Sequence, residues 1–534
     1  MTDIERILAL PVEETPEISA KIRGCVKPGG SMQLRPVQEA ALEYIHRHRG
    51  ALLALGIGCG KTLIGQLVPF VTGIPAERVL VLTKAPLIKE AKRQFAEYTD
   101  HFNVEMPIYL SYSKLSQPDA HDVLQRIDPE IIVADEAHCL KSSTATRTKR
   151  FFRFLRKRKG QGRPVHFVAM SGTLTGRSLT DYAHLASAAL GHASPLPHKY
   201  TVLESWCRCL DSKTRVPSTS WDWRDMDKLV KWSSVDPDTT KGRQHTARCA
   251  FAERMQTCQG VVCSTNSSCD KELIFKGEIT CEIPPQVKAA MKEAKSVMEI
   301  DGFEIEDPLR LSATLRELSQ GFYYRWDWGG REPDRQWLHR RSRLSCAVRE
   351  YIKRNPKFDS WSRVVNALAK GKIDKKYVSL HRAYEKWLEV AGRSAPDTRA
   401  VWLSSFLLDQ VAYKPGTVYW YGHRAVGKEL AKRIPTAMGG EDVPDSDCVA
   451  LSIASHGVGL NLQRYNNNVI LCPPGRGGIW EQLLGRTHRS LQTRDVSFSL
   501  YTHTPELKKA WKQANKDSEY IQETIKTVQR LNLK

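Results

Sequence analysis

The sequence predicts an α/β protein that has two parallel-sheet domains with a mainly helical insertion between them. Two series of short apolar runs alternate with segments of helical period, which is the pattern of a parallel sheet covered by crossover helices. The residues between the two series lack this alternation. The chain of 534 residues is long enough for about two to four domains. We expect the domains to be 1–185, 186–395 and 396–534.

Strands are expected where an apolar run ends in glycine, proline or polar residues. The first series predicts strands at 51–55, 78–82, 131–134 and 165–169. The second series predicts strands at 416–420, 448–454, 468–471 and 496–500, followed by a basic helix from about Pro505 to the end of the sequence.

The middle region is expected to be helical and packed. A helix that opens at Pro284 carries four apolar residues on one face, at offsets of 4, 3 and 4: Val287, Met291, Ala294 and Met298. A second helix is expected from Leu309 to Gln320, where Gly321 stops it. Nine of the 13 tryptophans lie between Trp206 and Trp387. This segment is therefore a domain rather than a linker.

The composition excludes several classes of protein. With 41% hydrophobic and 26% charged residues, the chain is neither disordered nor fibrous. No apolar stretch approaches the roughly 18 residues of a membrane span, and the first residues are acidic where a signal peptide is basic. The 13 cysteines are irregularly spaced, which is typical of reduced thiols. We therefore expect a cytoplasmic protein without a membrane partner. Its net charge of +21 favours polyanionic partners.

A phosphate-binding loop is the first chemical motif. The strand at 51–55 runs into Gly56-Ile-Gly58-Cys59-Gly60-Lys61-Thr62 and then into a helical segment. This arrangement places backbone N–H groups around an anion, with Lys61 reaching the β- and γ-phosphates and Thr62 offering its hydroxyl to Mg²⁺. Leu55 stands where the usual spacing has glycine. The alternative is a glycine-rich turn that carries a surface lysine.

Two carboxylates follow the strand at 131–134. Ligands of parallel sheets bind at the carboxyl ends of the strands. Asp135 would then lie beside the loop and hold the Mg²⁺ shell, while Glu136 orients or deprotonates an attacking water. The alternative is that the two carboxylates cap the helix that follows.

An enzyme that hydrolyses a nucleoside triphosphate with such a loop and carboxylates also needs positive charge to stabilise the departing γ-phosphate. Offsets of 4 and 3 place Gln482, Arg486 and Arg489 on one face of a predicted helix. The alternative is an ordinary basic face in contact with water. If Arg486 shares a site with Lys61, the site forms between segments that are distant in the chain.

These motifs, taken in order, resemble those of the superfamily 2 helicases. The series is Leu34-Arg-Pro-Val-Gln38, Gly56 to Thr62, Asp135-Glu-Ala-His138, Ser171-Gly-Thr173, Ser455-His-Gly-Val-Gly-Leu-Asn461 and Gln482 to Arg489. The closer resemblance is to the Swi/Snf-like DNA translocases, on Leu34 to Gln38, Pro86-Leu-Ile-Lys-Glu90, Gly457 to Leu462 and Gln492 to Val496. Two positions depart from that branch, because an acidic residue is usual near Leu55 and Gly56, and glycine is found in some members at Ala137.

The resemblance implies two RecA-like domains that close on ATP and Mg²⁺. The nucleotide-binding residues would be Gln38, which reads the adenine edge, Gly56, Gly58, Cys59, Gly60, Lys61, Thr62 and Gly459. Lys61, Asp135, Glu136, Gln482, Arg486 and Arg489 would be catalytic, with the two arginines acting as arginine fingers and with Thr62 and Asp135 at the metal. His138, Ser171 and Thr173 would couple the nucleotide to the second domain.

The resemblance also implies a grip on DNA by both domains. The contacts would come from Thr83, Lys84 and Pro86 in the first domain and from His423, Arg424, Ser455 and His456 in the second. The implied function is an ATP-dependent DNA translocase or helicase. Similarity to bacteriophage-encoded relatives suggests a role in phage DNA replication or repair, in the host cytoplasm, with replication or recombination proteins as partners. The alternatives are an RNA-dependent DEAH-type ATPase and a nucleic-acid-binding scaffold whose ATPase has decayed.

Two basic segments could hold the nucleic acid. Residues 141–163 contain ten Lys or Arg and no Asp or Glu, but an amphipathic helix in contact with water explains them equally well. The segment Arg340-Arg341-Ser-Arg343 follows the aromatic stretch 321–328, and packing of those rings is the favoured interpretation over a single-strand platform. Cys258, Cys263, Cys269 and His245 lack the paired spacing of a zinc site.

Overall fold

The computed structural model describes residues 1–533 except positions 213, 215, 237–239, 266–268, 302, 306, 307, 356, 357, 359, 360, 394, 395 and 458. The protein is mixed α/β, with two sheets of six parallel strands each, and its residues form two compact units. Unit 1 contains residues 1–143, 153–283 and 406–534, and unit 2 contains residues 144–152 and 284–405. Outside the gaps given above, no helix is both long and apolar enough to cross a membrane.

The first sheet of unit 1 has the strand order β3-β2-β4-β5-β1-β6. The strands are β1 (Ala51–Ala54), β2 (Val79–Thr83), β3 (Ile108–Ser111), β4 (Ile131–Asp135), β5 (His166–Met170) and β6 (Val261–Cys263). The four strands predicted from the first series are confirmed as β1, β2, β4 and β5. Their side chains are almost all buried, because helices cover both faces of a parallel sheet.

The helices that accompany this sheet come from the N-terminal half of the chain. They are α1 (Asp3–Leu8), α2 (Ala20–Arg23), α3 (Pro36–His48), α4 (Lys61–Thr72), α5 (Ala85–Thr99), α6 (Tyr112–Leu115), α7 (Ala120–Ile127), α8 (Thr146–Gly160), α9 (Ala183–Leu190), α10 (Tyr200–Leu210), α11 (Ser220–Trp232) and α12 (Gly242–Gln256). Apolar side chains of α3, α4, β1, β2 and β4 form one continuous core. This core fixes the start of α4, and with it the glycine-rich loop.

The second sheet of unit 1 has the order β13-β14-β12-β15-β16-β7. Its strands are β7 (Leu273–Ile279), β12 (Thr417–Tyr421), β13 (Thr436–Ala437), β14 (Cys448–Ser452), β15 (Asn467–Ile470) and β16 (Val496–Tyr501). The predicted second series is confirmed as β12, β14, β15 and β16. The helices here are α18 (Arg424–Leu430), α19 (Ile453–His456), α20 (Gly477–Leu484) and α21 (Pro505–Ile525). Trp480, Phe498 and Trp511 pack together in the core of this sheet.

The compact units divide the chain differently from the predicted domain boundaries. Residues 186–283 belong to unit 1, because β6 completes the first sheet and β7 pairs with β16 in the second. Residues 396–405 belong to unit 2, because β11 (Asp397–Trp402) pairs with β10 (Phe322–Asp327) in an antiparallel ribbon. Short edge strands and ribbons carry too weak a sequence pattern to predict these pairings.

Besides the first part of α8, unit 2 contains five helices and two antiparallel ribbons among its described residues. The helices are α13 (Pro285–Val297), α14 (Pro308–Leu318), α15 (Arg335–Arg354), α16 (Trp361–Ala369) and α17 (Val378–Ala391), and the second ribbon joins β8 (Glu299–Ile300) to β9 (Phe303–Glu304). Both helices predicted in this part are confirmed, as α13 and α14. Val287, Met291 and Ala294 are buried as expected. Met298 lies beyond the helix, because it forms the C-cap with a left-handed backbone (φ 57°).

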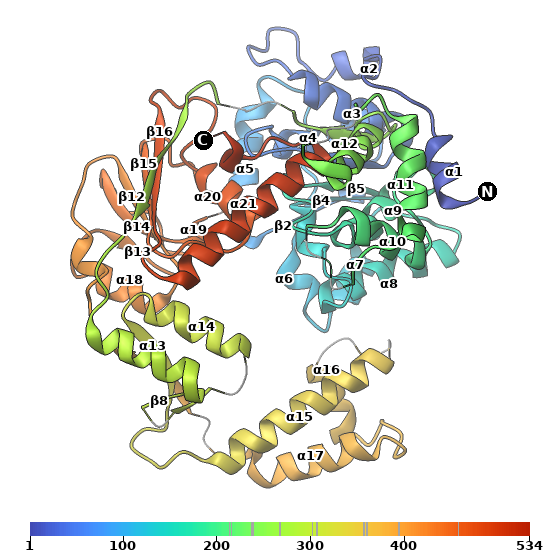
Figure 1. Ribbon diagram of the computed structural model, residues 1–534. Coiled ribbons are helices and arrows are strands. Elements are labelled where there is room, and N and C mark those ends of the chain that lie inside the picture. The colour runs from blue at the N-terminus through green and yellow to red at the C-terminus, as the bar shows by residue number, and fades with distance from the viewer. Residues whose placement is uncertain are drawn as a thin grey trace. The chain divides into compact units, whose positions relative to one another are not determined.

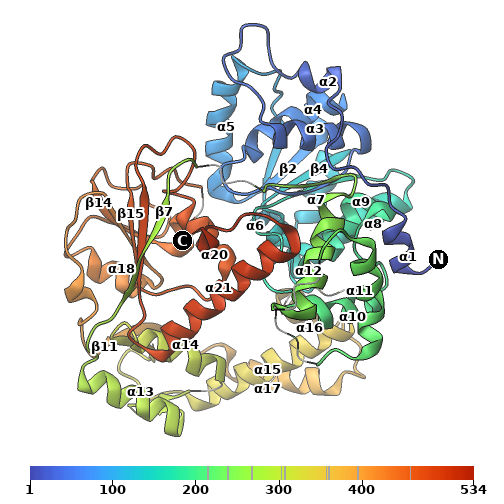
Figure 2. The ribbon, with the colours of Figure 1, turned by 45° about the horizontal axis from the view of Figure 1, so that its top comes forward.

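The C-terminal helix α21 links the two sheets of unit 1. It packs on both α20 and α12, as Figures 1 and 2 show. Arg177 donates to Asp517 of α21 (2.8 Å) and to the carbonyl of Gly475 (2.6 Å). The predicted helix to the end of the sequence is wrong in its length. The chain leaves α21 at Lys526 in a left-handed conformation (φ 60°), and the Thr527 hydroxyl donates to the carbonyl of Ala54 at the end of β1 (3.3 Å).

A buried ion pair holds the tail to α20. The guanidinium of Arg530 pairs with Glu481 and donates to the carbonyl of His488 at 3.1 and 2.7 Å. Both side chains are almost fully buried. Removal of one partner of a buried pair leaves an uncompensated charge.

We expect Arg530→Ala to lower the free energy of unfolding by about 3–5 kcal/mol, measured by urea unfolding. The matched control is Arg494→Ala, which removes an exposed arginine with one side-chain hydrogen bond, to the carbonyl of Arg464. This control is expected to change the stability by about 0.5 kcal/mol or less. Equal effects of the two substitutions would contradict a stabilising role of the buried pair.

Candidate functional site

A cavity of about 550 Å³ lies in unit 1 beside the glycine-rich loop. Its volume is within the usual range of small-molecule sites. Its lining includes many of the residues that the sequence singled out, among them Gln38, Gly58, Gly60, Lys61, Thr62, Thr83, Asp135, Glu136, Gly459, Asn461, Arg486 and Arg489. The structure thus brings residues of both motif series to one cavity.

The loop between β1 and α4 depends on its glycines. Gly58 (φ 91°) and Gly60 (φ 71°) have left-handed backbones, which glycine adopts without steric cost. A Cβ at Gly60 would also lie 2.2 Å from Nε2 of Gln38. The backbone N–H of Gly56 donates to Ser264 (2.8 Å), and Cys59 is part of the apolar core. Neither Gly56 nor Cys59 lines the cavity, although both were predicted to bind the nucleotide.

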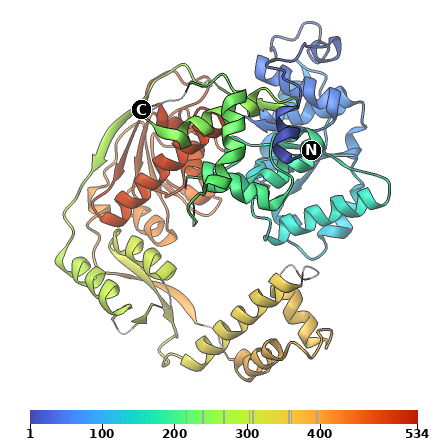
Figure 3. The ribbon, with the colours of Figure 1, turned by 45° about the vertical axis from the view of Figure 1, so that its right-hand side comes forward.

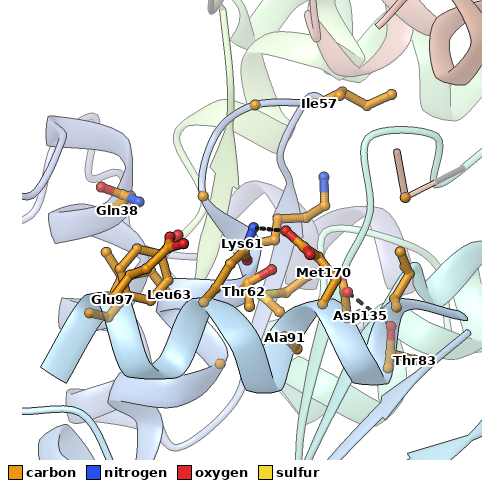
Figure 4. Close-up of a pocket in the computed structure, with 18 of the residues that line it drawn as sticks. Gln38, Ile57, Lys61, Thr62, Leu63, Thr83, Ala91, Glu97, Asp135 and Met170 are labelled. Atoms are coloured by element: carbon orange, nitrogen blue, oxygen red, sulfur yellow. Dashed lines mark hydrogen bonds between the residues drawn. The ribbon is translucent and has the colours of Figure 1, made fainter. Parts of the chain in front are cut away.

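Lys61 reaches back across the loop. Its Nζ donates to the carbonyls of Leu55 (3.0 Å) and Gly56 (3.1 Å), so the ammonium lies over the turn at the start of α4. Figure 4 shows Lys61, Thr62 and Asp135 next to one another in the cavity. The N-terminal turn of α4 adds the positive end of a helix dipole. This end of the cavity therefore favours an anion.

The carboxylate of Asp135 lies at the carboxyl end of β4. Its Oδ2 accepts a hydrogen bond from the Thr83 hydroxyl (3.1 Å), which is drawn in Figure 4. Its Oδ1 is buried and has no hydrogen-bond partner among the described residues. Burial and the neighbouring Glu136 carboxylate raise the pKa of Asp135 to about 6. Thr83 was predicted to contact DNA, but the structure places it in the cavity wall.

Glu136 has a left-handed backbone (φ 58°), which is uncommon for a residue other than glycine. Its Oε2 lies 3.1 Å from Nδ1 of His138. Burial raises the pKa of Glu136, but the hydrogen bond with His138 and the charge of Lys61 dominate and lower it well below its usual range. The carboxylate is therefore ionised at neutral pH.

The predicted coupling residues form one hydrogen-bonded network with Glu136. The Nδ1 atom of His138 lies 3.0 Å from the Ser171 hydroxyl and 3.3 Å from the Thr173 hydroxyl. Burial alone would lower the pKa of His138, but its hydrogen bonds with Cys139 and Glu136 raise it to about 9. A Cβ at Gly478, the second residue of α20, would lie 3.1 Å from the Thr173 side chain. The network thus reaches from Glu136 to α20.

Glycines allow the segments that carry the second motif series to pack closely against the first sheet's loop and helix. A Cβ at Gly485 would lie 3.0 Å from Ile57 of the loop, and a Cβ at Gly459 would lie 2.3 Å from Leu87 of α5. The prediction of one helical face for the arginine motif is wrong, because α20 ends at Leu484 and both arginines follow in turns. The chain must leave the helix here to bring Arg486 and Arg489 to the cavity. Gln482 is buried within α20 and does not line the cavity.

Arg486 is buried without an acidic partner. Its Nε donates to the carbonyl of Gln482 (2.9 Å) and its Nη1 to the carbonyl of Leu460 (3.3 Å). In the part of the chain that the structure describes, it forms no ion pair. Burial and the charge of Arg489 lower the pKa of Arg486 to about 10. A buried cation of this kind is costly unless an anion is supplied.

The other predicted DNA contacts lie at the carboxyl edges of the sheets. Lys84 and Pro86 follow β2, and Arg424 is exposed at the start of α18, which follows β12. His423 precedes Arg424, and Ser455 and His456 are in α19, which follows β14. His456 is buried, and its Nε2 lies 3.0 Å from the carbonyl of Glu441. Val458, within the Ser455 to Asn461 motif, lies outside the described residues.

Sequence reasoning missed several residues of the cavity. Asn461 and Arg35 lie inside quoted motifs without an assigned role, although Asn461 lines the cavity and Arg35 donates to the carbonyl of Gly58 (2.7 Å). Glu90 and Glu97 of α5 also line it. Glu90 is in the quoted Pro86 to Glu90 segment, but no sequence signal marked the side of α5 that faces the loop. The packing of α5 in the tertiary structure determines which of its side chains face the cavity.

The remaining candidate segments have structural partners. In the segment 141–163, Phe151 and Phe154 are buried and Arg158 pairs with Asp128 (2.5 Å). In the aromatic segment, Phe322 and Tyr323 are buried in the ribbon of β10 and β11. Among the described residues, there is no cluster of three or more metal-ligating side chains.

Comparison of the sequence with protein-family models and with curated proteins gives no match. The geometry of the cavity is therefore the basis for assigning a function.

We expect Gly60→Ala to weaken binding of a labelled nucleoside triphosphate about tenfold or more, measured by fluorescence titration. The added methyl group would meet Nε2 of Gln38 and displace the loop. The control is Gly73→Ala, which has a similar φ of 66° but open space around the added group. Weakening by both substitutions to the same extent would show that backbone strain, and not the contact with Gln38, is responsible.

Proposed function

We propose that the protein is an ATP-dependent motor that acts on DNA, built from two RecA-like domains with a mainly helical insertion. The observation that carries this proposal is the presence of Lys61 and Arg486 in the wall of one cavity, although they are distant in the sequence. The sheet orders and the helical content of unit 2 are compatible with such domains.

Two cations in the cavity support a nucleotide as its ligand. Arg486 is buried with only carbonyl partners in the described part of the chain, and Lys61 donates only to loop carbonyls there. Phosphate oxygens are stronger acceptors for both cations than neutral carbonyls. A triphosphate would therefore offset the cost of burying Arg486 and give Lys61 a charged partner.

The donors in the cavity also fit Mg²⁺. The buried Oδ1 of Asp135 has no partner among the described residues, and the Thr62 hydroxyl lines the same cavity. Mg²⁺ prefers such oxygen ligands and is usually held by one or two carboxylates together with substrate phosphates. When bound, the ion neutralises phosphate charge and polarises the phosphoryl group. A cation beside Asp135 favours its ionised form.

The side chains around the triphosphate would then have distinct roles. Gln38, which lies beside Gly60, reads the adenine edge, and Lys61 holds the β- and γ-phosphates. Glu136 accepts a proton from the attacking water or orients it, and the hydrogen bond with His138 fixes its carboxylate. Arg486 and Arg489 stabilise the negative charge that develops on the transferred phosphoryl group.

Hydrolysis would be coupled to movement through α20. This helix contacts the loop at Gly485 and the Thr173 side chain at Gly478, so loss of the γ-phosphate weakens its hold on the first sheet. If each sheet also binds the DNA backbone at its carboxyl edge, closing and opening of the cavity would move one DNA contact relative to the other. The net charge of +21 supports a polyanionic track.

The test of this function is ATP hydrolysis in the presence of duplex DNA, single-stranded DNA and RNA, compared at one salt concentration. We expect the greatest stimulation by DNA. Greater stimulation by RNA would identify an RNA-dependent ATPase, and nucleic-acid binding without hydrolysis would identify a scaffold. Strand-displacement and triplex-displacement assays on the best activator would then separate a helicase from a duplex translocase.

We expect Lys61→Ala and Arg489→Ala each to lower the DNA-stimulated turnover by about a hundredfold or more, while salt-sensitive DNA binding is retained. Both side chains are placed on the phosphates and not on the DNA. The control is Lys92→Ala, an exposed lysine of α5 that does not line the cavity. Turnover that persists in either cavity variant would refute the assigned roles.

A further inference from the structure

The helices α15, α16 and α17 of unit 2 form a small module with its own core. Leu344, Val348 and Tyr351 of α15 pack with Val364 of α16 and Leu380 of α17 in one apolar cluster. Figure 3 shows α15 and α17 side by side, in yellow and orange. Because the apolar face of α15 is used inside the module, the exposed surface of this helix is largely polar.

This module carries a large share of the positive charge of the protein. Residues 335–391 contain 15 Lys and Arg against five Asp and Glu, so their net charge is +10 of the +21 of the whole chain. Stability of three short helices does not require such an excess, because like charges repel within a small volume. The charge therefore indicates a function outside the module.

The structure separates the basic residues of α15 into two groups. Arg340 pairs with Glu389 of α17 (3.4 Å), and Arg341 stacks over the rings of Trp326 and Trp337. Arg340 thus links α15 to α17, and Arg341 packs on a ring of α15 itself and on a ring of β10. Arg343 of the same motif is exposed.

Arg343 belongs to a row of exposed cations along α15. The row consists of Arg335, Arg343, Arg349 and Lys353. At 100° per residue these positions fall on one side of the helix, together with the exposed Glu350 and opposite the buried Leu344 and Val348. In the part of unit 2 that the structure describes, none of the four side chains forms an ion pair or a hydrogen bond. At 1.5 Å per residue the row is about 27 Å long.

The length and chemistry of the row fit the backbone of duplex DNA. Duplex DNA has one negative charge per about 1.7 Å of its axis, and the forked guanidinium of arginine matches phosphate oxygens. Single-stranded nucleic acid usually requires exposed rings for base stacking, but the aromatic residues of α15, Trp337 and Tyr351, are buried on the side opposite the cations. A membrane surface requires an exposed apolar face beside the cations, and that face of α15 is buried in the module.

We propose that the exposed face of α15, defined by Arg335, Arg343, Arg349 and Lys353, is a second DNA-binding surface that holds the phosphates of duplex DNA. This inference rests on the proposed function, because it takes DNA as the substrate. The surface binds without reading sequence, since phosphate contacts carry no base information. It shares no residue with the cavity or with the DNA contacts predicted at the two sheets.

The experiment compares the full-length protein with the triple variant Arg343→Gln/Arg349→Gln/Lys353→Gln. Binding of a fluorescent duplex is measured without nucleotide at several salt concentrations. We expect affinity at low salt to fall about tenfold or more, and the slope of log affinity against log salt to decrease in magnitude by about two to three, since each phosphate contact contributes about 0.9. ATP hydrolysis in the absence of DNA is expected to be unchanged.

Two further variants control for charge and geometry. Lys288→Gln/Lys292→Gln/Lys295→Gln removes the same charge from the exposed face of α13 and is expected to leave the slope within about one of the wild type. Arg343→Lys/Arg349→Lys keeps the charge of α15 and should retain the slope. Equal losses in the α13 and α15 triple variants would overturn the proposal, because the effect would then be one of net charge alone.

Other outcomes separate this inference from the proposed function. If the wild-type protein binds no nucleic acid and none stimulates its ATPase, the proposed function fails, and the inference fails with it. If DNA stimulates the wild type and the α15 variant alike, with unchanged affinity and slope, only the inference fails. Competition by poly-glutamate as effective as that by duplex DNA at equal charge would assign the surface to acidic proteins and overturn its assignment to DNA.

Discussion

The close packing of α20 against the glycine-rich loop is the constraint on which the candidate site depends. Gly485 leaves space for Ile57, and Gly478 leaves space for Thr173. A larger side chain at either position would hold the two sheets further apart. Because the helix lies so close, the turns that follow it bring Arg486 to the same cavity as Lys61. The roles that we propose for Arg486 and Arg489 require this approach.

The C-terminal segment after α21 also holds α20 and the glycine-rich loop in this arrangement. Thr527 donates to the carbonyl of Ala54, at the end of β1, and Arg530 is bound to Glu481 within α20. One short segment thus contacts both the strand that ends in the loop and the helix that precedes the arginines. A buried ion pair contributes little net stability compared with an apolar pair. Its value here lies in the defined geometry that it imposes on α20.

The protein uses its positive charge in two different environments. In the cavity, Arg486 is buried, and a bound anion would offset the cost of its desolvation. On α15, the cations are exposed and interact with water and salt, so their contribution to binding falls as the salt concentration rises. The difference explains why substitutions in the cavity and on α15 are expected to affect hydrolysis and DNA binding separately.

The sequence by itself determined the local elements of the fold and the identity of the chemical groups. Eight strands of the two sheets followed from short apolar runs, because burial on both faces of a parallel strand leaves a continuous apolar pattern. The loop from Gly56 to Thr62 and the pair Asp135 and Glu136 followed from residue type and spacing. These properties depend on neighbours in the chain.

Only the tertiary structure decided what distant segments do together. It joined β6 and β7 to the two sheets, placed Thr83 on Asp135, and separated the outward-facing Arg343 from Arg340 and Arg341. Sequence periodicity also placed Arg486 and Arg489 on a helix that ends before them. Such features depend on packing between segments hundreds of residues apart, and local pattern carries no information on which segments meet.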